Sequence, residues 1–93
     1  MTHDRGPQIE IAQTPNPNAL KFTVDRKVVE SGSRSYSTRF EALNDPLASA
    51  IFAISGVQSL FCMADFITVI KDPGAAWEGI VREVEAAIRE HLA

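Results

Sequence analysis

The stretch VQSLFCMADFITVIK, residues 57–71, constrains the fold more than any other part of the sequence. It contains two runs rich in β-branched and aromatic residues, separated near Ala64 and Asp65. Two such runs with a short break between them predict a β-hairpin. We expect its second arm, FITVIK, to lie centrally in a sheet.

Two further strands are predicted near the start of the chain. In Gln8–Gln13 apolar and polar residues alternate, which puts Ile9 and Ile11 on one face of a strand at the edge of the sheet. Asn18–Val24 alternates in the same way and is expected to be its antiparallel neighbour. In the polar, serine-rich segment that follows, residues 25–45, the apolar pair Val28 and Val29 predicts a brief third strand and then a long exposed loop.

The remaining segments have the sequence signals of helices. Asp45 suits the N-cap of the first helix, Pro46 its first turn and Gly56 a left-handed stop. Its predicted buried stripe consists of Leu47, Ala50, Ile51 and Ile54. A longer helix is predicted after Asp72, with Trp77, Ile80, Val81, Val84 and Ile88 at spacings of three and four. The predicted fold class is α+β: a mostly antiparallel sheet of about four strands with two helices on one face.

Length and composition limit the classes of function. Ninety-three residues suffice for one domain, which we place at residues 8–93, after a disordered stretch at 1–7. The net charge is −3 and the basic residues are scattered, which disfavours nucleic acid as a partner. Cys62 is the single cysteine, so neither an intrachain disulfide nor a cysteine zinc site within one chain is expected. The polar N-terminus has no long apolar run, so we expect a cytoplasmic protein without membrane contact.

Few residues are candidates for chemistry. A lone cysteine in a strand, such as Cys62, is more often a small buried side chain than a nucleophile, and Asp65 would raise its pKa. His3 and His91 have no sequence neighbour that would orient them as a base or metal ligand, and His91 suits the C-terminal end of the last helix. These residues do not form a catalytic constellation, which predicts that the protein is not an enzyme.

The other polar candidates have structural interpretations as well. Arg34 and Arg39 in the serine-rich segment could bind an anion, but no glycine-rich fingerprint followed by a helix accompanies them, which favours a solvated loop. Asp65 is interpreted as a turn residue and Asp72 as a helix cap.

The loop in TPNPNALKF, residues 14–22, is a candidate interaction site. Its tip, Asn16, Pro17 and Asn18, could present amide groups to a partner at fixed angles. The same residues also explain a rigid crossover, because proline fixes φ and asparagine side chains bond back to the backbone. We favour the structural role and keep the interaction role open.

The ordered blocks TPNPNALKF, DPLASAIFAISGVQSLF and DFITVIK, with Trp77 at the entry to the last helix, resemble the N-terminal domain of Nfu/NifU-type iron–sulfur scaffold proteins. The resemblance covers nearly all of residues 8–91. It implies a small α+β domain that usually precedes a second domain, whose Cys-X-X-Cys motif holds an iron–sulfur cluster. This chain contains no such motif. Where relatives resemble F-X-G-P-D-F, it has FCMADF, so Met63 and Ala64 replace glycine and proline and a different turn is expected.

The resemblance leads to two hypotheses from different classes. The first is a non-enzymatic accessory or interaction module of iron–sulfur cluster assembly, whose partners are assembly or recipient proteins, among them one bearing the missing Cys-X-X-Cys domain. Besides the Asn16–Pro17–Asn18 tip, its partner surface would be the open sheet face. The second is a homodimer that binds iron or a cluster directly through Cys62. Neither hypothesis includes a cofactor built into the domain. A third hypothesis, an uncharacterised enzyme, is the least favoured.

Overall fold

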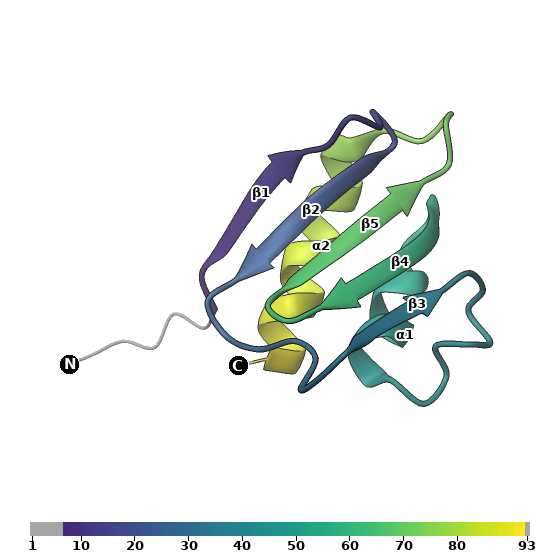
Figure 1. Ribbon diagram of the computed structural model, residues 1–93. Helices are drawn as coiled ribbons and strands as arrows, with labels where there is room; N and C mark the ends of the chain where they lie inside the picture. Colours follow the sequence, from purple (N-terminus) through teal and green to yellow (C-terminus); the bar gives the residue numbers. More distant parts are fainter. Residues whose placement is uncertain (1–6, 93) are drawn as a thin grey trace.

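The computed structural model describes residues 7–92 and forms one sheet with two helices (Figure 1). In chain order the elements are β1 (Ile9–Gln13), β2 (Ala19–Val24), β3 (Ser33–Tyr36), α1 (Pro46–Phe52), β4 (Val57–Met63), β5 (Phe66–Lys71) and α2 (Trp77–Leu92). His3 and most of the stretch predicted to be disordered lie outside the described residues. Pro7, the one described member of that stretch, has a fully buried side chain.

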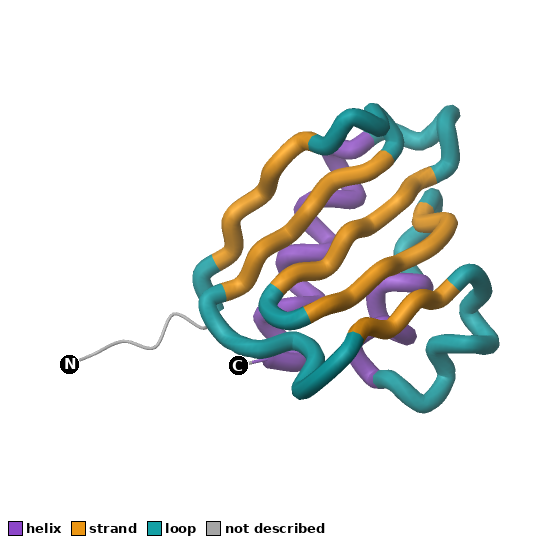
Figure 2. The backbone as a smooth tube through the Cα atoms, viewed as in Figure 1, coloured by secondary structure: helices purple, strands orange, loops and turns teal. Residues whose placement is uncertain are grey.

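The five strands form one antiparallel sheet in the order β1-β2-β5-β4-β3. Both helices cover the same face, and no other element within residues 7–92 covers the opposite face, called the open face below (Figures 1 and 2). This arrangement confirms the predicted fold class, with five strands instead of about four. It also confirms that β1 lies at an edge and that β5 is the central strand.

The third strand is not where the sequence predicted it. Val28 and Val29 belong to a loop, and their N–H groups donate to the carbonyl oxygen of Ala64 at 2.7 and 3.1 Å. The strand that completes the sheet is β3, which pairs with β4 although only its last residue, Tyr36, is buried. The apolar content of the sequence therefore does not predict the strand at this edge. The strand forms because the backbone of β4 supplies its hydrogen-bond partners, and it needs few buried side chains of its own.

Helix α1 begins as predicted but ends earlier. Asp45 is its N-cap, with the side chain accepting a hydrogen bond from the N–H of Ala48, and Pro46 is its first residue. The helix ends at Phe52. Ile54 is buried as predicted, but it belongs to the turns after the helix. Gly56 has the predicted positive φ, +98°. A Cβ at Gly56 would lie 2.9 Å from the Cβ of Ala75, so close packing requires glycine there as well.

The core lies between the helices and the covered face of the sheet. Helix α2 starts at Trp77, four residues after Pro73. Asp72 is therefore too far away to be its N-cap, and the prediction of a helix cap at Asp72 was wrong. Asp72 instead accepts a hydrogen bond from the N–H of Ala75 in the preceding turn. No helix within residues 7–92 is long and apolar enough to span a bilayer. The core side chains with no exposed surface are Phe22, Ala42, Ile51, Ile67, Val69, Val84 and Ile88.

The β4–β5 hairpin turns through Ala64 and Asp65, as predicted. Ala64, not Met63, takes the unusual backbone conformation, with φ of +49°. A proline cannot adopt that φ, so this turn differs from one that carries proline at the same position. The carbonyl oxygen of Asp65 accepts the N–H of Val24 at the end of β2, and that of Ala64 accepts the N–H groups of Val28 and Val29 in the following loop. These bonds hold the strained conformation in place.

Candidate functional site

The loop between β1 and β2 uses its polar groups internally. The hydroxyl oxygen of Thr14 lies 2.9 Å from the carbonyl oxygen of Asn16 and accepts the N–H of Asn16 at 3.1 Å. The side-chain oxygen of Asn16 accepts the N–H of Asn18 at 2.9 Å, which is an Asx turn. These short-range bonds fix the crossover that the two prolines begin.

Two distant side chains attach this loop to the rest of the molecule. The Lys71 ammonium donates to the side-chain oxygen of Asn18 at 3.0 Å, and the Trp77 indole N–H donates to the carbonyl of Pro17 at 3.0 Å. Lys71 is only 6% exposed, and its nitrogen lies 5.6 Å from the centre of the Trp77 ring. A buried ammonium needs such partners, so Asn18 satisfies a charge within the fold.

These contacts support the structural role of Asn16, Pro17 and Asn18. A hollow of about 250 Å³ lies beside them, between Gln13–Pro17 and the Trp77 ring, and remains open to a partner. The sequence did not reveal the role of Lys71, because its partner is 53 positions away and no local pattern connects the two.

Cys62 lies on β4 at a buried position, on the side of the sheet that the helices cover. It is 4% exposed, and burial together with the nearby Asp45 raises the pKa of its thiol to about 11. The carboxylate is Asp45 and not Asp65 as expected from the sequence. Arg34, directly opposite on β3, acts in the other direction and lowers the pKa. The thiol is therefore protonated at neutral pH.

A cavity of about 210 Å³ adjoins Cys62, and Asp45 and His91 also line it. The carboxylate of Asp45 is already occupied, because it accepts the Tyr36 hydroxyl at 2.8 Å as well as the N–H of Ala48. Within residues 7–92 there is no group of three or more His, Cys, Asp or Glu side chains placed to hold a metal. The remaining lining is apolar and consists mainly of Val28, Val29, Leu47, Ile51 and Leu92.

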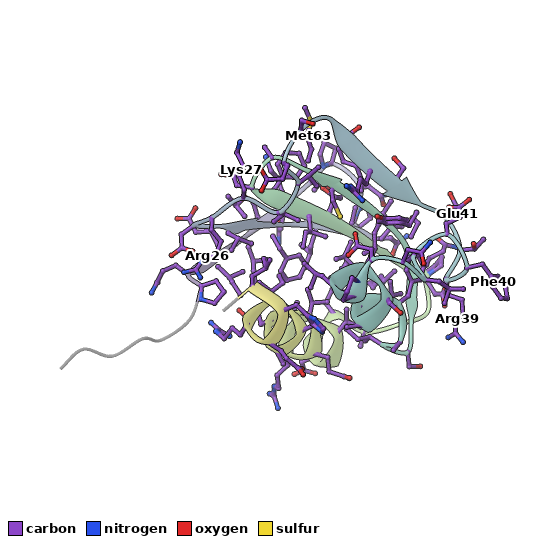
Figure 3. The ribbon with its side chains drawn as sticks, turned by 90° about the horizontal axis from the view of Figure 1, so that it is seen from below. Arg26, Lys27, Arg39, Phe40, Glu41 and Met63 are labelled. Atoms are coloured by element: carbon purple, nitrogen blue, oxygen red, sulfur yellow. The ribbon has the colours of Figure 1, made fainter. Side chains whose placement is uncertain are left out.

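Arg34 and Arg39 differ in their surroundings. Arg34 lies beside the Tyr36 hydroxyl, which raises the pKa of its guanidinium. Arg39 extends from the 37–44 loop next to Phe40, away from the sheet (Figure 3). Arg34 therefore belongs to β3 and only Arg39 to the loop, so the two arginines of the serine-rich segment are not held on one element.

The open sheet face carries a small apolar cluster. The rings of Phe61 and Phe66 have centroids 6.1 Å apart, and the Lys21 ammonium lies 4.4 Å above the Phe66 ring. Met63 is on the same side, 44% exposed, and Figure 3 shows it with Lys27 pointing away from the helices. Its sulfur and that of Cys62 are on opposite faces of β4, as expected for adjacent strand positions.

The 37–44 loop presents a second exposed apolar surface that the sequence did not predict. Phe40 is 76% and Leu43 is 63% exposed. The loop is held in shape by Glu41, whose carboxylate accepts the N–H of Ser37 at 2.6 Å and whose N–H donates to the Thr38 hydroxyl. The spacing of Thr38 and Glu41 is the pattern of a capping box, the one sequence signal that could have indicated an ordered turn here.

A family model described as "Scaffold protein Nfu/NifU N terminal" matches residues 9–93. The chain belongs to this family. The match confirms the resemblance of the ordered sequence blocks.

Individual relatives agree with the family match. The chain is 37% identical over 82 residues to NifU-like protein 5, mitochondrial, of Arabidopsis thaliana, covering 88% of this chain and 30% of the relative. It is 37% identical over 86 residues to the human protein named NFU1 iron-sulfur cluster scaffold homolog, mitochondrial, covering 91% and 34%. The chain thus spans about a third of the length of these curated relatives.

A solved structure extends the likeness to three dimensions. The solution NMR structure of a NifU-like protein from Saccharomyces cerevisiae matches with a TM-score of 0.82 and 32% identity. The match covers 99% of this chain and 83% of that chain. The sheet and helices described above are therefore the fold of an Nfu/NifU N-terminal domain.

Proposed function

We propose that this chain is a non-enzymatic interaction module of iron–sulfur cluster assembly. The observation that carries the proposal is the match of residues 9–93 to the N-terminal domain of Nfu/NifU scaffold proteins. Two side chains of the cavity beside β4 support it, because Cys62 is buried with a raised thiol pKa and the Asp45 carboxylate already accepts two hydrogen bonds. The surface presents exposed apolar and aromatic side chains, which suit contact with a protein partner.

We propose that the partners are iron–sulfur assembly or recipient proteins, among them one that bears a Cys-X-X-Cys domain. Two surfaces are candidates for contact: the open-face cluster with Phe61, Met63 and Phe66, and the hollow beside the Asn16–Pro17–Asn18 tip. The open face is the stronger candidate, since the polar groups of the tip are satisfied within the chain.

Affinity purification with variant baits tests this proposal. The wild-type bait is expected to recover iron–sulfur assembly proteins. Met63→Glu should reduce that recovery, because a carboxylate replaces an exposed thioether opposite Phe66 in the apolar cluster, whereas Gln58→Glu, an exposed change outside the cluster, should not. Recovery of no such protein under several growth conditions would count against the function, and equal recovery by both variants would count against the surface.

The alternative function is direct binding of iron or a cluster by a homodimer through Cys62. It requires the thiol to leave the core and lose its proton, and its 4% exposure and raised pKa both oppose this. Anaerobic reconstitution with iron and sulfide separates the two proposals. Visible absorption that disappears in Cys62→Ser would support the alternative, and a colourless wild type would exclude it.

The cellular setting that we propose is the cytoplasm. A single, buried cysteine is compatible with a reducing compartment. The human and Arabidopsis relatives are named mitochondrial, so the location needs its own test. Fractionation of cells expressing the full chain should place it with cytoplasmic markers, and recovery with an organelle or membrane fraction would contradict this.

A further inference from the structure

The outer side of β1 is one of the two edges of the sheet. β1 is the first strand in the order and pairs only with β2 among the described elements (Figures 1 and 2). Four of its five residues are exposed, and Ile11 retains 39% of its surface. Its side chain points to the helix side of the sheet, because it lies opposite the buried Phe22.

The register shows which backbone groups of β1 point outward. The N–H of Asp25 donates to the carbonyl of Gln8 at 3.1 Å, so these two residues form a hydrogen-bonded pair. In an antiparallel ladder such pairs alternate with pairs that exchange no backbone hydrogen bond. Glu10 and Ala12 therefore bond to β2, while the N–H and carbonyl groups of Ile9, Ile11 and Gln13 point away from the sheet.

Glu10 is the one charged side chain on this edge, and the other usual protections against pairing are absent from Ile9–Gln13. β1 contains no proline or lysine, and its register with β2 is continuous, without a bulge. The opposite edge differs: β3 has four residues, one of them Arg34, and leads into the 37–44 loop. An edge strand of five residues with a single charge is a template for another strand.

We propose that two copies of this chain pair through β1, antiparallel, about a two-fold axis at Ile11. Ile11 then lies opposite Ile11 of the second copy, and Ile9 lies opposite Gln13. This register satisfies every outward N–H and carbonyl of the strand in both copies. It also places Glu10 opposite Ala12, so the carboxylates of the two copies do not oppose each other.

The axis runs perpendicular to the sheet, so the product is a ten-stranded sheet, five strands from each copy, with all helices on one side. The two Ile11 side chains meet on the helix side, which covers their exposed apolar surface. The open face remains free for a partner. The inference is therefore independent of the proposed function.

This dimer also differs from the one that a Cys62 metal site would need. Cys62 is on β4, three strand spacings from β1, so the two thiols would be separated by seven spacings, roughly 34 Å at about 4.8 Å per spacing. No single metal or cluster could bridge them. A cluster-bridged dimer and a β1-paired dimer can consequently be distinguished.

Molar mass measured by light scattering, from micromolar to millimolar concentration, tests the pairing. The mass of the wild type should rise from 10.2 kDa toward twice that value. Ile11→Pro removes an outward N–H without removing a bond to β2, and Ile11→Lys puts two ammonium groups at the axis. Each should weaken dimerisation at least about tenfold, equivalent to 1.4 kcal/mol. Leu43→Lys is the matched control, since it also replaces an exposed apolar residue by lysine, and it should dimerise like the wild type.

Amide hydrogen exchange gives a second readout. The N–H groups of Ile9, Ile11 and Gln13 should exchange more slowly as concentration rises, while those of Glu10 and Ala12 should be protected throughout. Circular dichroism checks that the variants are folded. A wild type that stays monomeric, a dimer that both Ile11 variants retain, or outward amides whose exchange is independent of concentration would each overturn the proposal.

Discussion

At the scale of single residues, Ala64 carries a conformational cost that the rest of the turn maintains. An L-residue in the left-handed region costs about 1–2 kcal/mol, and glycine avoids that cost although it loses about 0.5–1 kcal/mol through unfolded-state entropy. Three backbone N–H groups, from Val24, Val28 and Val29, bind the carbonyl oxygens of the turn and keep φ at +49°. The conformational cost is therefore confined to Ala64, and one substitution can remove it.

We predict that Ala64→Gly raises the free energy of unfolding by about 0.5–1 kcal/mol, the difference between the two costs. Ala86→Gly on the exposed side of α2 is the matched control, and the same chemical change should lower it by about 1 kcal/mol. Urea unfolding measures both. A destabilised Ala64→Gly variant would show that the turn is not strained.

Cys62 gives a pH-dependent prediction. Its folded pKa, about 11, is above the ordinary value of 9.0, so the folded state holds the proton more tightly than the unfolded state. This contribution to stability is complete below pH 9 and is lost as pH rises from 9 to 11. At pH 10.5 the wild type should have lost about 2 kcal/mol more than Cys62→Ala, relative to neutral pH. Parallel urea titrations at the two pH values check this, and equal losses would mean that the thiol is accessible to solvent.

At the scale of elements, the 14–18 loop shows how far sequence analysis reaches. Proline and asparagine predicted a rigid crossover because their effects are local. The attachments to Lys71 and Trp77 could not be predicted, since they depend on which strands become neighbours.

The same limit explains why the third strand was predicted at the wrong place. β3 forms because β4 provides a backbone partner, whereas the apolar Val28–Val29 pair packs in the core. Arg34 beside Cys62 was missed for this reason too.

Asn18→Ala tests the attachment of the loop. It removes an oxygen acceptor from a buried ammonium, so the free energy of unfolding should fall by about 1.5–3 kcal/mol. Asn44→Ala, at an exposed position, should change it by no more than about 0.5 kcal/mol. Combining Asn18→Ala with Lys71→Met should cost less than the two single effects added together, because the charge that needs Asn18 is gone. Additive effects would indicate that the two side chains act independently.

At the scale of the whole molecule, stability rests on apolar packing. Within residues 7–92 the one ion pair joins Arg26 and Asp25, which are both exposed, so charge pairing adds little. The predicted fold class was correct because the alternation in the strands and the helix spacing both report on this core directly. The surface has no comparable pattern, which is why the exposed Phe40 and Leu43 became evident only in the structure.

The free energy of unfolding should accordingly be almost independent of salt, changing by less than about 0.5 kcal/mol between low and high sodium chloride. Ile51→Ala, by contrast, should lower it by about 2–5 kcal/mol, because Ile51 has no exposed surface. Denaturation curves at two salt concentrations measure the first effect and curves at one concentration the second. A strong salt dependence would reveal charge interactions that the described contacts do not include.

The position of β5 in the middle of the sheet has a consequence for synthesis of the protein. β5 lies between β2 and β4 but is the last strand to be made, so a growing chain can pair β1 with β2 and yet cannot join them to β4. Helix α2, which covers much of the core, comes later still. Non-local pairing of this kind delays folding until nearly the whole chain has left the ribosome, and an arrested nascent chain ending before Phe66 should remain sensitive to protease.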